Sequence, residues 1–320
     1  MVTTQLIENY RDRVTYNMLR VIPNFSLNYI PKLRTICVEV TNHCNLTCKM
    51  CNVHVQKRKY GYMDIELFKK IILQSSQLKP STLHLNFEGE SFLHPQIKDF
   101  LELSLASGAK YRQLFSNGMR VKPYLETIAK TLTKITFSLD GIGEVNDNIR
   151  VGCKYDVIIN NIKELRLIRD TLRSPLQIGV NLTNYTQTEK EIKDFTKEML
   201  NIADIVQISE YRDPQNHYTK PGYDRRTALK NVNDKRIART VRYCAFPLNT
   251  IVILWNGEIS FCLCAVTSHP PMIEGFNANQ DKLKNIWRST WWKTMRNNAF
   301  RLGYPPYGEC VECEYRKVIR

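Results

Sequence analysis

The sequence has no long hydrophobic run, no leader-like start and fewer carboxylates than cations. Nothing in its 320 residues approaches 18 consecutive apolar residues, and no N-terminal apolar run ends in a small-residue cleavage site. We therefore expect neither a membrane-spanning helix nor a secretory signal, and we predict a cytoplasmic protein. The 43% hydrophobic content and the lack of low-complexity tracts predict a globular chain, with one large domain and a small appendage.

The chain is strongly basic. Its 46 Lys and Arg residues outnumber 31 Asp and Glu residues, which gives a formal net charge of +15. Such a charge predicts an anionic partner, namely a phosphorylated substrate, a nucleic acid or an acidic redox protein. The alternative is a basic surface that serves only solubility. The run of cations over residues 209–243 can be explained in the same way, as a solvated linker.

Ten cysteines are many for a chain expected in a reducing compartment, where clustered thiols indicate metal ligands or catalytic groups. Cys44, Cys48 and Cys51 follow a C-x3-C-x2-C spacing. With His54 they could close a tetrahedral zinc site. Alternatively, three thiolates could hold three irons of a [4Fe–4S] cluster and leave the fourth iron open to a small molecule. The spacing alone leaves both alternatives open.

Strand and helix patterns alternate along most of the chain. Strands are predicted at 35–41, 81–88, 111–116, 134–140, 176–183 and 204–209, and helices at 63–75, 94–108, 121–132, 155–172 and 189–200. This alternation predicts an α/β fold with parallel strands, in six units that form an open, barrel-like (β/α)6 sheet. Sites in such sheets lie at the carboxyl ends of the strands, where the loop with the three cysteines begins.

Four segments are expected. Residues 1–34 form a helical lead-in, 35–210 the (β/α)6 core, 211–243 a basic linker and 244–320 a small second domain. In the second domain, Asn256-Gly257 predicts a hairpin, and 281–300 is helical in pattern.

The cysteine loop after the first strand resembles that of the radical S-adenosylmethionine (radical SAM) superfamily. The sequence "FEGESFLHP" is similar to the family's Gly-Gly-Glu-Pro turn, which holds the methionine amino group. Gly89 and Glu90 match this turn, whereas Glu88 replaces its first glycine and Ser91 its proline. The later strand ends "SNG" (116–118) and "FSLDG" (137–141), and then "NIRVG" (148–152), match in order.

The resemblance implies a partial (β/α)6 TIM-like barrel whose three cysteines hold a [4Fe–4S] cluster that binds S-adenosylmethionine. Reductive cleavage would release a 5′-deoxyadenosyl radical, with the electron supplied by an acidic donor such as flavodoxin or ferredoxin. The implied cofactor contacts are Met50, Gly89, Glu90, Ser116, Asn117, Ser138 and Arg150.

A second cysteine set resembles the SPASM and Twitch auxiliary-cluster domains. Cys244, Gly257 and Cys262 match the opening C-x(9–15)-G-x4-C, and Cys310 and Cys313 follow. The resemblance implies that these four cysteines ligate one closed auxiliary [4Fe–4S] cluster, as in the single-cluster Twitch-like form. A zinc site on the same residues is the alternative.

Three cysteines remain. Cys37 is expected in the core, whereas Cys153 and Cys264 are either inert or hydrogen-atom donors to a substrate radical, which an epimerase would need.

We predict dehydrogenation of a small polar substrate, such as a sugar, aminoglycoside or nucleotide derivative. Only 34 residues precede the first strand, so we expect no peptide-recognition domain there. Radical epimerisation and ribosomal-peptide modification are the alternatives. A zinc-stapled RNA-binding protein would explain the charge and the cysteines, but not the motifs at the strand ends.

Overall fold

The structure is a computed structural model that describes residues 30–51, 53–211, 241–262, 272–301 and 317–319. The predicted N-terminal helix and most of the basic linker lie outside these residues.

Six parallel strands form the centre of the fold, in the order β1-β2-β3-β4-β5-β6. They are β1 (Thr35–Val38), β2 (Thr82–His84), β3 (Tyr111–Ser116), β4 (Lys134–Ser138), β5 (Gln177–Asn184) and β6 (Ile205–Glu210). The predicted α/β fold with a mostly parallel sheet is confirmed, although β1 and β2 are shorter than their patterns indicated.

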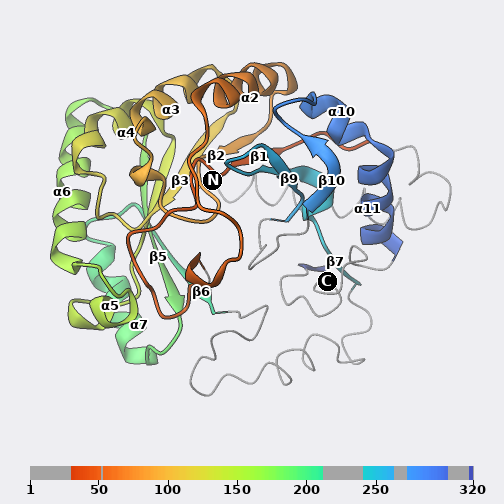
Figure 1. Cartoon of the computed structure of the whole chain (residues 1–320). Coiled ribbons are helices and arrows are strands. Elements are labelled where there is room, and N and C mark those ends of the chain that lie inside the picture. Colours follow the sequence, from red (N-terminus) through yellow and green to blue (C-terminus); the bar gives the residue numbers. More distant parts are fainter. Residues whose placement is uncertain (1–29, 52, 212–240, 263–271, 302–316, 320) are drawn as a thin grey trace.

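Helices follow the strands and lie in an arc along the outer side of the curved sheet (Figure 1). They are α2 (Ile65–Leu78), α3 (Ile97–Leu103), α4 (Leu125–Thr131), α5 (Glu144–Ile149), α6 (Tyr155–Thr171) and α7 (Glu189–Met199), with the short 3-10 turns η1 (Val53–Val55), η2 (Ser91–Leu93), η3 (Ser104–Ser107) and η4 (Lys122–Tyr124). Sequence patterning missed α5, because six residues are too few to show a helical period.

Polar side chains define where helices begin. Asp64 caps α2 by accepting hydrogen bonds from the backbone N–H groups of Glu66 and Leu67. Thr188 and Glu191 form a reciprocal capping box at the start of α7. Such caps satisfy N–H groups that have no partner within the helix.

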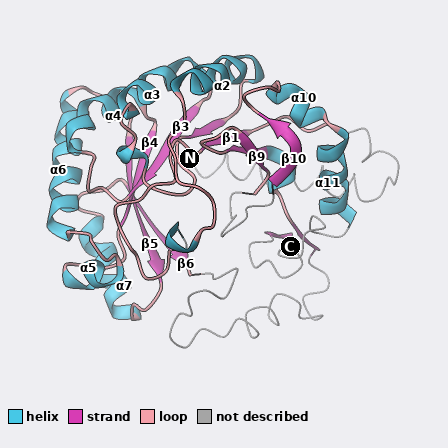
Figure 2. Ribbon diagram, viewed as in Figure 1, coloured by secondary structure: helices cyan, strands magenta, loops and turns pink. Residues whose placement is uncertain are grey.

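The C-terminal region continues the same sheet (Figure 2). Strand β8 (Thr250–Ile253) pairs in parallel with β1, and the hairpin of β8 and β9 (Glu258–Ser260) turns at Gly257 as predicted. With β10 (Met272–Asn277) the order is β10-β9-β8-β1-β2-β3-β4-β5-β6. The other elements are β7 (Val241–Tyr243), paired with β11 (Lys317–Ile319), and the helices α9 (Phe246–Asn249), α10 (Leu283–Arg288) and α11 (Thr290–Arg301).

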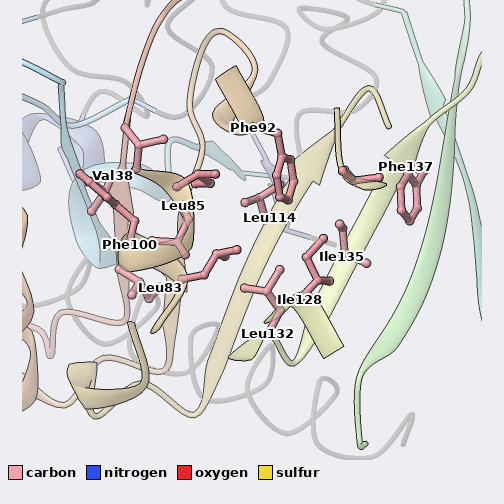
Figure 3. Packing of buried hydrophobic residues seen from close by; sticks show 14 of the residues in the cluster. Val38, Leu83, Leu85, Phe92, Phe100, Leu114, Ile128, Leu132, Ile135 and Phe137 are labelled. Carbon is pink, nitrogen blue, oxygen red and sulfur yellow. The ribbon is translucent and has the colours of Figure 1, made fainter. Parts of the chain in front are cut away.

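The core lies between the sheet and the outer helices. Figure 3 shows Leu83, Leu114 and Ile135 of successive strands close to Ile128 and Leu132 at α4. All five side chains are at most 2% exposed. Continuous aliphatic runs are typical of parallel strands covered on both faces. Within the described residues, no helix has the length and apolar character needed to cross a membrane.

We predict that Trp292→Ala lowers the free energy of unfolding by about 3–5 kcal/mol. Trp292 of α11 is fully buried, lies 4.9 Å from the Trp287 ring and donates a hydrogen bond of 2.8 Å from Nε1 to the carbonyl of Pro247. Urea unfolding followed by circular dichroism measures the change. Leu73→Ala is the control, because Leu73 is 63% exposed and its loss should change stability by less than about 0.5 kcal/mol. Equal effects of the two substitutions would contradict the prediction.

Candidate functional site

A cavity of about 640 Å³ opens at the carboxyl ends of the parallel strands. Its lining includes Cys44, Cys48 and Cys51, from the loop that follows β1. Residues that follow β2 and residues at the carboxyl ends of β3, β4, β5 and β6 also line it. The topology therefore brings the sequence-predicted strand-end motifs together around one space, as expected for a parallel sheet.

The loop with the three cysteines is held against the segment around α5. The backbone N–H of Thr47 donates to the carbonyl of Val151, and that of Lys49 to the carbonyl of Ile149, both at 2.9 Å. A further hydrogen bond, from the N–H of Cys51 to the carbonyl of Cys48, closes a tight turn. These contacts fix the backbone from which the thiols project.

The three thiols fit a cluster that needs thiolate ligands. Burial raises the pKa of Cys44 to about 11 and that of Cys51 to about 12, and burial also raises the pKa of Cys48. Without a cation the thiols are therefore protonated at neutral pH, and metal binding must displace the protons. Three thiols on one loop suit a [4Fe–4S] cube, in which each thiolate binds a different iron.

Gly89 brings the turn after β2 against the cysteine loop. Its φ of +78° lies in the left-handed region, and a Cβ there would lie 2.7 Å from backbone atoms of Thr41, Asn42 and His43. The N–H of Glu90 donates to the carbonyl of His43 at 2.7 Å. Only glycine allows this close approach of two backbones.

Glu90 joins the ends of β2 and β3. Its fully buried carboxylate accepts hydrogen bonds from Ser116 Oγ at 2.9 Å and from the backbone N–H groups of Asn117 at 2.7 Å and Phe92 at 3.2 Å. Burial raises the pKa of Glu90, and these hydrogen bonds oppose that effect. Asn117 extends the connection, since its Nδ2 donates to Asn45 Oδ1 in the cysteine loop at 2.9 Å.

Arg150 lines the cavity and pairs with Asp140, a residue that sequence reasoning did not single out. Arg150 Nε lies 2.7 Å from Asp140 Oδ2, and the Asp140 side chain is fully buried. The other carboxylate oxygen accepts a hydrogen bond of 2.6 Å from the N–H of Thr183. Asp140 is the aspartate of "FSLDG", and its position at the end of a predicted strand could have identified it as a site residue. Ser138 and Met50 also line the cavity, as half-buried side chains.

A second buried ion-pair network lies beside the cavity and was also missed. Arg58 donates to both carboxylate oxygens of Glu39, at 2.6 and 2.9 Å, and to Glu88 at 2.7 Å. Glu39 accepts a further hydrogen bond of 3.3 Å from the N–H of Trp255. Glu88, which stands where the family motif has glycine, is thus charge-matched by Arg58. The network joins β1, the cysteine loop, the β2 turn and the C-terminal region.

The remaining cysteines are placed differently from one another. Cys37 is 1% exposed, as expected for a core residue. Cys153 is 3% exposed, accepts a hydrogen bond of 3.3 Å from Asn146 and is not among the residues that line the cavity. This position does not favour Cys153 as a hydrogen donor. Cys244 and Cys262 are half-buried, whereas Cys264, Cys310 and Cys313 lie outside the described residues.

The side of the cavity formed by β5 and β6 is a polar wall that the motifs did not predict. Asn181 and Thr183 of β5 and Gln207 and Ser209 of β6 line it, and Ser209 Oγ donates to Asn181 Oδ1 at 2.7 Å. The sequence could have predicted this wall, because polar and apolar residues alternate in "VNLT" and "VQIS". In strands such alternation turns every second side chain to the same face.

Comparisons with known proteins agree with this geometry. Residues 38–197 match the family model of the radical SAM superfamily, and residues 244–314 match that of SPASM, an iron–sulfur cluster-binding domain. A protein of Pyrococcus furiosus, described as a tungsten-containing aldehyde ferredoxin oxidoreductase cofactor-modifying protein, is 23% identical over 89% of this chain and 88% of its own.

Solved structures share the fold. SuiB of Streptococcus suis, bound to precursor peptide SuiA, has a TM-score of 0.67 at 15% identity and covers 97% of this chain and 74% of its own. BtrN, in complex with AdoMet and 2-DOIA, has a TM-score of 0.51 at 16% identity, with 89% and 93% covered. The two family models confirm the predicted superfamily and, with it, the predicted iron–sulfur clusters and S-adenosylmethionine cofactor.

We predict that Gly89→Ala weakens S-adenosylmethionine binding at least about tenfold, equivalent to ~1.4 kcal/mol. The added methyl group combines the strain of a left-handed backbone with a clash against the cysteine loop. Equilibrium binding to the reconstituted protein measures the loss.

Gly275→Ala is the matched control. Gly275 has a φ of +80°, but a Cβ there meets nothing within 4 Å. The same backbone strain without the clash should leave cofactor affinity unchanged. If both variants bind S-adenosylmethionine like the wild type, the contact between turn and loop does not shape the site.

Proposed function

Because the chain belongs to the radical SAM superfamily and carries a SPASM cluster-binding domain, we propose that it dehydrogenates a small polar substrate held at the β5–β6 side of the cavity. The observation that carries the proposal is a single cavity that is lined both by three thiols and by the polar wall of β5 and β6.

The cofactors and the protein have separate tasks. When bound, the catalytic cluster and S-adenosylmethionine would supply a 5′-deoxyadenosyl radical for removal of a hydrogen atom from the substrate, and the auxiliary cluster would supply an acceptor for the remaining electron, while the remaining proton would pass to a base or to water. Cys44, Cys48 and Cys51 would hold the catalytic cluster. The proposed contacts to S-adenosylmethionine are the lining residues Met50, Gly89, Glu90, Ser116, Asn117, Ser138 and Arg150.

The polar wall supports a substrate rich in hydroxyl or amide groups. Asn181, Thr183, Gln207 and Ser209 supply both donors and acceptors, so they can orient such a substrate without a fixed charge. Among the described lining residues, Glu88 is paired with Arg58 and Arg150 is paired with Asp140, which leaves the carboxylates of Glu90 and Glu210. This balance favours a neutral or amine-bearing substrate over the anionic one that the net charge suggested.

The placement of Cys153 does not support it as the hydrogen donor of an epimerase. An epimerase needs a thiol on the substrate face, and Cys153 lies off the cavity wall. Cys264 remains the candidate donor for that alternative. The proposed ligands of the auxiliary cluster are Cys244, Cys262, Cys310 and Cys313.

We predict that changing Cys44, Cys48 and Cys51 together to Ala halves the iron content, from about eight to about four atoms per chain. The auxiliary cluster should persist, because it has its own four cysteines. Release of 5′-deoxyadenosine under chemical reduction should stop. A triple variant that still releases 5′-deoxyadenosine would show that the catalytic cluster is held elsewhere.

We predict that turnover in deuterium oxide leaves no solvent deuterium at the reacting carbon, because an oxidation does not return hydrogen to it. Candidate substrates are a panel of sugars, aminoglycosides and nucleosides, with short peptides as the alternative class, and mass spectrometry of the product gives the label. Cys264→Ala and Cys153→Ala should both retain turnover. One deuterium in the product, together with loss of turnover in either variant, would identify an epimerase. Turnover of peptides alone would favour peptide modification.

A further inference from the structure

The outer surface of the cysteine loop carries only positive charge. Between Glu39 and Asp64 the sequence has no Asp or Glu. Lys49, Lys57 and Lys59 are exposed, whereas Arg58 is turned inward to Glu39 and Glu88. In Figure 1 this loop is the red-to-orange segment in the centre of the view, away from the outer helices. Three exposed lysines with no carboxylate between them in the sequence thus lie on the segment that bears the three cysteines.

Two exposed aromatic side chains lie on the same loop. Tyr60 and Tyr62 are 46% and 44% exposed, although tyrosine rings are usually covered to a greater degree. The His43 ring stacks on Tyr62, with centroids 4.6 Å apart, and lies 5.3 Å from the Tyr60 ring. Aromatic residues on a polar surface are enriched in protein interfaces.

These aromatic rings contact both ends of the cysteine segment. His43 directly precedes Cys44, and the Tyr60 hydroxyl donates a hydrogen bond of 2.9 Å to the carbonyl of Val53, two residues after Cys51. A partner bound over Tyr60 and Tyr62 would therefore lie against the backbone that holds the thiols.

We propose that Lys49, Lys57, Lys59, Tyr60 and Tyr62 form the docking surface for a small acidic one-electron carrier protein. The proposal rests on the proposed function, since reductive cleavage of S-adenosylmethionine consumes one electron from outside the chain. The carrier loses that electron and the cluster held by Cys44, Cys48 and Cys51 gains it, with no bond made or broken in the transfer. Opposite charges on the two proteins accelerate their encounter, and the aromatic pair supplies contact area at the centre of the interface.

Charge reversal of Lys57 and Lys59 together tests the surface. The probe is reduced flavodoxin, an acidic flavin carrier, mixed with the reconstituted holoenzyme. We expect K57E/K59E to bind the carrier at least about tenfold more weakly and to be reduced by it correspondingly slowly at low salt. Binding is measured by titration, and cluster reduction by stopped-flow absorbance. For the wild type, the carrier-driven rate should fall as salt rises.

Two controls separate this proposal from the proposed function. Reduced methyl viologen, a small cationic reductant, should drive 5′-deoxyadenosine release equally in K57E/K59E and the wild type. K163E/K193E, which reverses two exposed lysines on the outer helices α6 and α7, should bind the carrier like the wild type. Loss of release with methyl viologen in the wild type would overturn the proposed function itself.

Three results would overturn the docking surface. The first is carrier binding and reduction in K57E/K59E at wild-type levels. The second is a rate of cluster reduction by the carrier that does not change with salt concentration in the wild type. This measurement does not depend on the folding of any variant. The third is a charge-reversed protein that binds flavodoxin normally but loses affinity for a single-stranded RNA oligomer, because the surface would then serve a nucleic acid.

Discussion

The site depends on the close approach of two backbone segments. These are the turn at Gly89 and the chain at Thr41–His43. The first strand must deliver the cysteine loop and the second must deliver the turn, and neighbouring parallel strands end at the same edge of the sheet. A side chain at position 89 would push them apart. Glu90 then connects this turn to the end of β3, because its carboxylate accepts hydrogen bonds from Ser116 and Asn117. Three strand ends are thus held in register by one glycine and one buried carboxylate.

Charges buried around the cavity are matched within the protein. The Glu39–Arg58–Glu88 network and the Arg150–Asp140 pair are both largely withdrawn from solvent. Buried ion pairs of this kind contribute little net stability, because desolvation offsets their attraction, whereas removal of one partner is costly. Their value here is geometric. Arg58 connects the cysteine loop to the turn that carries Glu88, and Trp255 brings the C-terminal region into the same network.

The sequence predicted the parts of this structure that repeat or that match a motif. Strand β3 was placed at its observed bounds, because "YRQLFS" lies between a glycine-terminated helix and a turn. The cysteine loop, Gly89, Ser138 and Arg150 could be placed because each follows a predicted strand. Asp140 and Arg58 could not be paired with their partners, since a contact between residues distant along the chain leaves no periodic signal. The pairing of β8 with β1 was missed for the same reason, as its partner lies more than 200 residues away.

Net charge was the least specific guide to the substrate, and the structure explains why. A global charge describes association and solubility, not the lining of one cavity. Here the described lining holds three carboxylates and one guanidinium, whereas Lys49, Lys57 and Lys59 are exposed on the loop whose cysteines line the same cavity. The loop thus has two faces with different chemistry. Its inner face presents three thiols to the cavity, and its outer face presents cations to solvent. The three exposed lysines of this loop thus contribute to the surface of the protein and not to the lining of the cavity.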